Sequence, residues 1–159
     1  MTSELLKENS MTKTAFVYVT YINSTPQRIW DALTKPEFTR QYWEHDNVSD
    51  WKPGSKWEHR TQKGEARIVG EVIENDPPKR LVITWAAPNE ASDPKKRSRV
   101  TFELVPIDEM VQLTVTHDEL EAGSSMDSGI RKGWPRVLAS LKTLLETGKP
   151  LNTWAKKKD

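Results

Sequence analysis

Three histidines could act as acid, base or metal ligand in this chain, but their spacing is not typical of a metal site. The 159-residue sequence contains His45, His59 and His117 and no cysteine. The histidines match neither H-x-x-x-H nor HExxH, the helical spacings that bring two imidazoles to one metal ion. The lack of cysteine excludes disulfides, iron–sulfur clusters, thiolate zinc sites and cysteine nucleophiles. We expect neither a metal nor a cofactor.

His117 is the one candidate for acid–base catalysis. It continues an alternating run of apolar residues, Val111, Leu113 and Val115, which predicts an inward position at the end of a strand. There it would act as hydrogen-bond partner or general base for a bound molecule, or it would only serve the fold through a bond to the backbone. Both interpretations stay open. Two serines follow at 124 and 125 without a nucleophile elbow, so no serine triad is predicted.

Tryptophan stands out in the composition. Seven of the 159 residues are tryptophan, and large amphipathic rings in a polar chain either line a cavity or fill a small core. If they line a cavity, we expect a ligand to contact side chains that line the space between the sheet and the last helix. The expected contacts are Trp43, Trp57, Trp85, Phe102, Val115, His117, Trp134, Leu138 and Leu141.

Hydrophobic periodicity predicts one strand, two short helices, a run of further strands and a long final helix. Alternating β-branched and aromatic residues predict the strands, and their hairpin-sized connections predict an antiparallel sheet. Gly70 inside a strand indicates a bulge or a close approach of another group. The predicted strands are 14–22, 55–61, 66–74, 80–86, 97–105 and 110–117, and the predicted helices are 26–34, 36–43 and 128–147.

The last helix has to pack against the sheet, because it is the only long amphipathic element. Its apolar residues recur at helical spacing from Ile130 to Leu145 and form one broad stripe. A curved sheet around a single helix leaves a gap in which a ligand would lie, with the polar loops at 88–96 and 119–128 as its gates. Pro135 predicts either a kink in this helix or a separate short turn at 128–132.

The composition excludes several classes of protein. With 24 Lys and Arg against 23 Asp and Glu, the net charge of +1 is too small for a nucleic-acid binder. No apolar run approaches the length of a membrane span, and the first ten residues lack the pattern of a signal peptide. We therefore expect a cytoplasmic protein with a flexible tail at 1–12, one domain at 13–148 and a second tail at 149–159.

Six segments in fixed order resemble a known family. They are STPQRIWDALTKPE at 24–37, YWEHDNVSDWKPGSKW at 42–57, GEVIENDPPKRLVITW at 70–85, RVTFELVP at 99–106, LTVTH at 113–117 and GWPRVLASLKTLLETG at 133–148. Together they resemble the START-like superfamily, also called SRPBCC or helix-grip, and within it the group related to the activator of Hsp90 ATPase homologue 1. The resemblance implies an α+β, START/Bet v 1-like fold. In that fold a curved antiparallel sheet of six to seven strands wraps around a long C-terminal helix, and two short helices follow the first strand.

The resemblance also implies a hydrophobic cavity, because relatives bind lipids, sterols, plant hormones and polyketides. We therefore expect a binding domain for a small hydrophobic or aromatic ligand, lipid-like or polyketide-like, rather than an enzyme. A cyclase, dehydratase or hydrolase that uses His117 is one alternative, since a few relatives are cyclases or aromatases.

An Hsp90-type co-chaperone or stress-response interaction module is the other alternative, and an exposed apolar patch at Trp51 or Trp154 would favour it. The eukaryotic co-chaperone carries a separate N-terminal Hsp90-binding domain for which this chain has no room, so Hsp90 activation is not expected. A homodimer is left open.

Overall fold

The computed structural model describes residues 12–151, which form one antiparallel sheet and three α-helices. Its seven strands follow the order β1-β7-β6-β5-β4-β3-β2, so that β1 and β2 form the two edges. The predicted α+β helix-grip fold is confirmed. The strands are β1 (Lys13–Ile22), β2 (Asp46–Val48), β3 (Lys56–Arg60), β4 (Ala66–Asp76), β5 (Arg80–Trp85), β6 (Ser98–Ile107) and β7 (Met110–Glu121).

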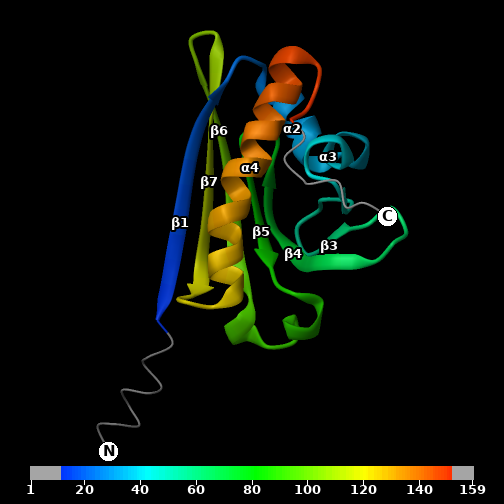
Figure 1. Cartoon of the computed structure of the whole chain (residues 1–159), viewed down its shortest axis with the longest axis vertical. Helices are drawn as coiled ribbons and strands as arrows, with labels where there is room; N and C mark the ends of the chain where they lie inside the picture. The colour runs from blue at the N-terminus through cyan, green and yellow to red at the C-terminus, as the bar shows by residue number, and fades with distance from the viewer. Residues whose placement is uncertain (1–11, 152–159) are drawn as a thin grey trace, which may run out of the picture.

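The long helix α4 (Ser125–Thr147) lies across the concave face of the sheet, as Figure 1 shows. The short helices α2 (Pro26–Thr34) and α3 (Pro36–Tyr42) lie beside the C-terminal half of α4. Two 3-10 turns, η1 (Pro88–Glu90) and η2 (Pro94–Lys96), form the loop between β5 and β6. Within residues 12–151, none of the helices combines the length and the apolar character that crossing a membrane requires.

Local signals set the helix ends. The Thr25 hydroxyl accepts a hydrogen bond from the Arg28 amide at 3.2 Å, and Pro26 occupies the first helical position of α2. The Ser124 hydroxyl accepts one from the Asp127 amide at 3.1 Å and starts α4, which ends at Gly148 with a φ of 86°.

The sheet bends where β4 leaves its regular pairing with β5. The register shifts between Val72 and Glu74, and Gly70 lies at the gap in the ladder. The indole of Trp57, opposite Gly70 on β3, crosses this gap and donates to the Thr84 carbonyl at 2.7 Å. A Cβ at position 70 would collide with the Thr84 carbonyl and the Trp57 ring nitrogen. The close approach predicted at Gly70 is therefore confirmed.

The structure corrects the predicted loop at 119–128. β7 continues through Glu121 and α4 already starts at Ser125, so the connection is only three residues long. The strand end was predicted as loop because β7 contains a bulge there. The β1–β7 register shifts between Thr14 and Phe16, and Glu119 has a φ of 55°. The bulge interrupts the alternation of inward and outward residues after His117, so the sequence pattern does not indicate that the strand continues.

β2 and α4 also differ from the prediction. β2 was not predicted, because three residues with the sequence DNV carry almost no strand signal. α4 runs through Pro135 as one helix, so the separate turn at 128–132 is wrong, whereas a kink at Pro135 stays a prediction. The predicted tails lie mostly at residues 1–11 and 152–159, outside the described part of the chain.

Replacing Gly70 with alanine should lower the free energy of unfolding by about 3 kcal/mol, because the new methyl group displaces the Trp57 indole from the Thr84 carbonyl. Urea denaturation of both proteins measures this difference. Gly129→Ala is the matched control, since a Cβ at that position meets open space. Equal losses in the two variants would contradict this account of the bend.

Candidate functional site

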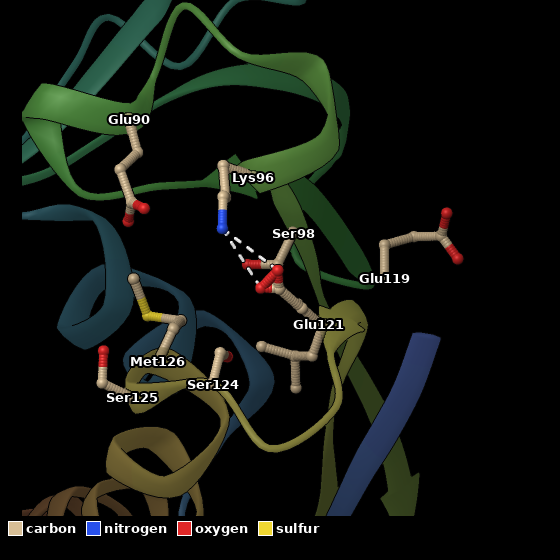
Figure 2. A pocket seen from close by; sticks show the side chains of 9 residues that line it. Glu90, Lys96, Ser98, Glu119, Glu121, Ser124, Ser125 and Met126 are labelled. Carbon is tan, nitrogen blue, oxygen red and sulfur yellow. Dashed lines mark hydrogen bonds and ion pairs between the residues drawn. The ribbon is translucent and has the colours of Figure 1, made fainter. Parts of the chain in front are cut away.

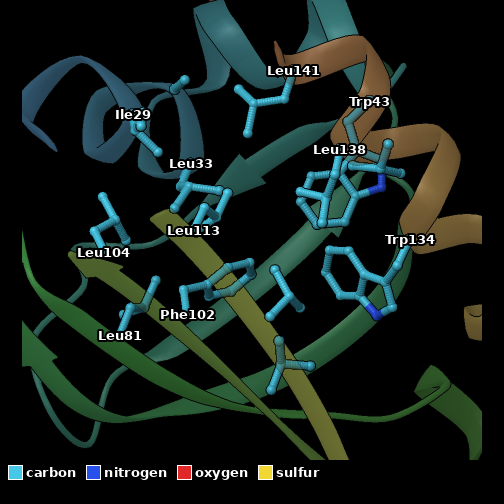
Figure 3. Packing of buried hydrophobic residues seen from close by; sticks show 14 of the residues in the cluster. Ile29, Leu33, Trp43, Leu81, Phe102, Leu104, Leu113, Trp134, Leu138 and Leu141 are labelled. Atoms are coloured by element: carbon cyan, nitrogen blue, oxygen red, sulfur yellow. The ribbon is translucent and has the colours of Figure 1, made fainter. Parts of the chain in front are cut away.

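All nine side chains predicted to contact a ligand lie in one buried core between the sheet and α4. Each has at most 8% of its surface exposed, and Figure 3 shows Trp43, Trp134, Phe102, Leu138 and Leu141 converging between the helix and the strands. The structure therefore brings the nine predicted residues together in one place. The space among them decides whether they bind a ligand or only fill the core.

Four tryptophan rings and His117 fill most of that space by contacting one another. The Trp85 ring lies at the centre, with centroid distances of 5.4 Å to Trp57, 5.4 Å to Trp134 and 6.1 Å to Trp43. The imidazole of His117 packs edge-on against Trp85 at 5.3 Å. These are the distances of direct aromatic contact. We call these five residues the ring cluster.

A small apolar pocket remains between the ring cluster and the first half of α4. Its volume is about 120 Å³. Three of the nine predicted contacts, Trp43, Trp85 and Trp134, line it, and the other six pack deeper in the core. The remaining walls come from α4: Gly129, Ile130, Gly133 and Val137.

The two glycines were missed as site residues although the sequence contains a signal for them. Gly129 and Gly133 are four residues apart and therefore share one face of α4. A Cβ at either position would meet open space. Glycine spaced in this way beside an apolar helical stripe indicates a place where the helix surface is hollowed.

His117 is fully buried and both of its ring nitrogens are engaged. The Trp134 indole N–H donates to Nδ1 at 3.0 Å. Since an indole nitrogen can only donate, Nδ1 carries the lone pair and Nε2 carries the proton. Nε2–H then donates to the Ser98 hydroxyl at 2.8 Å, and that hydroxyl donates to the Trp85 carbonyl at 2.9 Å. The chain of bonds links α4 to three neighbouring strands.

In this tautomer His117 has no free lone pair with which to act as a general base. The lone pair that would take a proton already accepts the Trp134 N–H, and the nitrogen facing Ser98 is a donor. Ser98 is therefore not activated as a nucleophile. Burial also lowers the pKa of His117 to about 3, because the apolar surroundings disfavour the imidazolium form. Both ring nitrogens bond side chains, Trp134 and Ser98, and not the backbone group that one of the two interpretations expected.

His59 forms a second buried network of the same kind. The Asn47 side-chain amide donates to the Leu33 carbonyl at 3.1 Å, which leaves its oxygen to accept from His59 Nδ1–H at 2.7 Å. Burial lowers the pKa of His59 to about 3. His45 lies nearby, with its ring centroid 5.3 Å from that of His59. No group of three or more metal-ligating side chains forms anywhere in residues 12–151.

A second, polar pocket of about 240 Å³ lies where the predicted gate loops meet (Figure 2). The Lys96 ammonium bridges both carboxylate oxygens of Glu121 at 3.0 and 3.1 Å and so ties the 88–96 loop to the end of β7. Neither predicted gate loop supplies a wall of the apolar pocket. The polar pocket is lined by Glu90, Lys96, Ser98, Glu119, Leu120, Glu121, Ser124, Ser125 and Met126.

The sequence matches one family model, described as activator of Hsp90 ATPase homolog 1-like protein, over residues 23–146. No curated protein matched the sequence.

Solved structures share the fold over most of their length. A protein from Mesorhizobium loti is 26% identical with a TM-score of 0.71, and the match covers 84% of this chain and 97% of that one. An Aha1 dimer from Colwellia psychrerythraea is 22% identical with a TM-score of 0.71, covering 86% and 98%. An HSP90 activator from Plasmodium falciparum is 22% identical with a TM-score of 0.69, covering 86% and 97%.

The two buried histidines should make the fold sensitive to mild acid. Their folded pKa of about 3 lies below the ordinary histidine pKa of 6.5. Unfolding therefore takes up protons, and the stability that is fully present above pH 6.5 is lost as the pH falls. Between pH 6.5 and 5 the free energy of unfolding should fall by up to about 1.4 kcal/mol per pH unit for each histidine.

Urea denaturation across this pH range measures the slope, and His117→Gln should remove about half of it. A slope that His117→Gln leaves unchanged would show that other groups cause the acid sensitivity.

Proposed function

We propose that this chain, which belongs to the family of activator of Hsp90 ATPase homolog 1-like proteins, is a binding domain that holds a small hydrophobic or aromatic molecule between the ring cluster and α4. The single observation that carries the proposal is the apolar pocket against Gly129 and Gly133. The family and its fold agree with such a role, and the apolar walls of the pocket support it directly.

The two glycines weaken the helix without any steric need for glycine. Each costs about 0.5–1 kcal/mol relative to alanine in a helix interior. Neither has a positive φ, and a methyl group would fit at both positions. Both glycines line the open volume opposite Trp43 and Trp85. We infer that this volume has a use, namely to accept part of a ligand.

The size and walls of the pocket define the ligand's buried part. An apolar cavity of about 150 Å³ in another protein accepts benzene, so about 120 Å³ suits one ring or a short alkyl chain. Three indole rings offer faces and edges for aromatic stacking. None of the lining side chains is charged, and burying an unpaired charge there would be costly. The buried part is therefore neutral, and a larger lipid-like or polyketide-like ligand would insert only one end.

The pocket supports binding better than catalysis. None of its seven lining residues has a side chain that titrates near neutral pH. His117 is the one catalytic candidate, and its Nδ1 lone pair already accepts the Trp134 N–H, so it is not free to act as a base. The cyclase, dehydratase and hydrolase alternatives therefore lack an acid or base at the apolar pocket.

The family description favours a second candidate, an interaction with an Hsp90-type chaperone. The expected apolar patch is not at Trp51, whose ring stacks on Trp57 at 6.4 Å and whose indole donates to the Thr34 carbonyl at 2.9 Å. Trp154 lies outside the described residues. Measuring the ATPase rate of purified Hsp90 with and without the chain tests this candidate, and an unchanged rate would remove it.

The ligand proposal predicts that benzene and toluene bind with their ring in the pocket. Each should raise the melting temperature, because a ligand that binds only the folded state stabilises it. In ¹H–¹⁵N spectra the indole signals of Trp43, Trp85 and Trp134 should shift, while that of Trp51, outside the pocket, should not. If no ring compound produces either effect, the proposal is wrong.

Gly133→Ala should separate stability from binding. Without ligand it should raise the free energy of unfolding by about 0.5–1 kcal/mol, and it should abolish the shift in melting temperature caused by toluene because its methyl group occupies the pocket. Ser128→Ala, on the exposed side of α4, is the control: it changes helix propensity and keeps toluene binding. Unaltered binding by Gly133→Ala would contradict the assignment of the pocket.

A further inference from the structure

One residue in the wall of the apolar pocket has a hydrogen-bond donor without a partner. The indole N–H of Trp85 is buried, and among the described residues it is one of four buried side-chain polar atoms that make no hydrogen bond. The other three belong to Ser24, His45 and Asn75, and none of these residues lines the apolar pocket. Buried polar atoms without a partner are rare in folded proteins, so the Trp85 N–H needs an explanation.

The rings that surround Trp85 do not supply the missing acceptor. Three of them are the indoles of Trp43, Trp57 and Trp134, whose nitrogens donate and never accept. The fourth is His117, whose Nδ1 already accepts the Trp134 N–H and whose Nε2 is a donor. The face of an aromatic ring is only a weak acceptor. The ring cluster therefore leaves the Trp85 N–H unpaired.

A water molecule in the apolar pocket would be held poorly. A buried water needs about two to four polar partners. The side chains that line this pocket contain no acceptor, and their only polar atoms are the three indole nitrogens. One of these, the nitrogen of Trp134, is already bonded to His117. A ligand that brings an acceptor to Trp85 would therefore displace no firmly bound water.

The walls of the pocket thus discriminate between an acceptor and a donor on the ligand. A ring that carries an acceptor atom can take the Trp85 N–H and still pack its faces and edges against apolar walls. A ring that carries a donor finds no acceptor among the lining side chains. It would leave its own N–H or O–H unpaired in addition to that of Trp85, and both would lose their bonds to water.

We propose that the buried ring of the ligand carries a hydrogen-bond acceptor, such as a ring nitrogen or a carbonyl or ether oxygen, which takes the N–H of Trp85. This assignment rests on the proposed function, because it names the chemistry of the molecule that the apolar pocket holds. Trp85 is then a specificity-determining residue: the apolar walls admit any small neutral ring, and the N–H favours a ring that accepts.

Three small aromatic rings of similar size separate these cases. Benzene has no polar atom, pyrrole has a donor, and pyridine has an acceptor and is uncharged at neutral pH. Titrations of the full chain, followed in ¹H–¹⁵N spectra, measure the three dissociation constants. Pyridine should bind at least about tenfold more tightly than pyrrole, because only pyridine pairs the buried N–H.

The same spectra identify the donor in the wild-type chain. The indole proton of Trp85 should move to lower field with pyridine than with benzene, because a hydrogen bond deshields the proton that is donated. The indole proton of Trp134 is already bonded to His117, so its position should differ little between the two ligands.

Trp85→Phe removes the N–H and keeps an aromatic ring, so it should abolish the preference for pyridine over pyrrole. Trp43→Phe is the matched control: it also shortens an indole in the pocket wall, but it leaves the Trp85 N–H in place and should keep the preference. The ratio of the two dissociation constants cancels the change in pocket size that both variants cause. If either variant does not fold, the wild-type spectra still decide the assignment.

If benzene binds and pyridine is not preferred over pyrrole, the acceptor assignment is wrong and the proposed pocket stands. If Trp43→Phe abolishes the preference and Trp85→Phe keeps it, or if the Trp85 proton does not move to lower field with pyridine, the assignment to Trp85 is wrong. If none of the three rings binds, the proposed function fails and the acceptor assignment fails with it.

Discussion

The interior of this protein depends on one constraint: a polar atom placed among aromatic rings must find a hydrogen-bond partner there. Trp57 meets it by donating to the Thr84 carbonyl, which spans the gap left by the bulge in β4. Trp134 meets it through His117, and the same chain of bonds continues to Ser98. Because a lost partner would cost about 1–3 kcal/mol, these bonds fix the positions of the rings as well as of the strands. Trp85 is the exception, since its indole N–H has no partner among the described residues.

The same constraint separates binding from catalysis in this fold. A histidine can act as a base only if one nitrogen keeps a free lone pair directed at a substrate. At His117 an indole donor takes that lone pair, and replacing the indole by an acceptor would reverse the tautomer. The chemistry open to a helix-grip interior thus depends on the donor or acceptor character of a single neighbour. Here that neighbour makes the histidine part of the framework, and what remains for a ligand is the apolar volume beside Gly133.

Much of the fold could be predicted from local sequence patterns, but the state of the site could not. Alternation predicted most strands and an inward position for Trp85, Phe102, Val115 and His117, and helical spacing did the same for Trp134, Leu138 and Leu141, because burial repeats with the period of the element. It failed after His117, where a bulge changes the period, and at β2, which is too short to show one. Neither the tautomer of His117 nor the filling of the interior follows from any local pattern, since both depend on residues from distant elements meeting.

The ring cluster, the pocket and the edge of the sheet all involve α4, each through a different face of the helix. Its apolar stripe holds the ring cluster, its glycines leave the pocket, and its basic residues reach over the edge of the sheet. Arg131 is held by Asp127 at 2.7 Å, lies 5.5 Å from the Phe16 ring centroid and caps the Ala15 carbonyl. It lies one turn or less from both glycines that line the pocket. A helix anchored in this way cannot shift to widen the pocket without also loosening the cap on β1. The open volume at Gly129 and Gly133 therefore comes from missing side chains and not from a displaced helix.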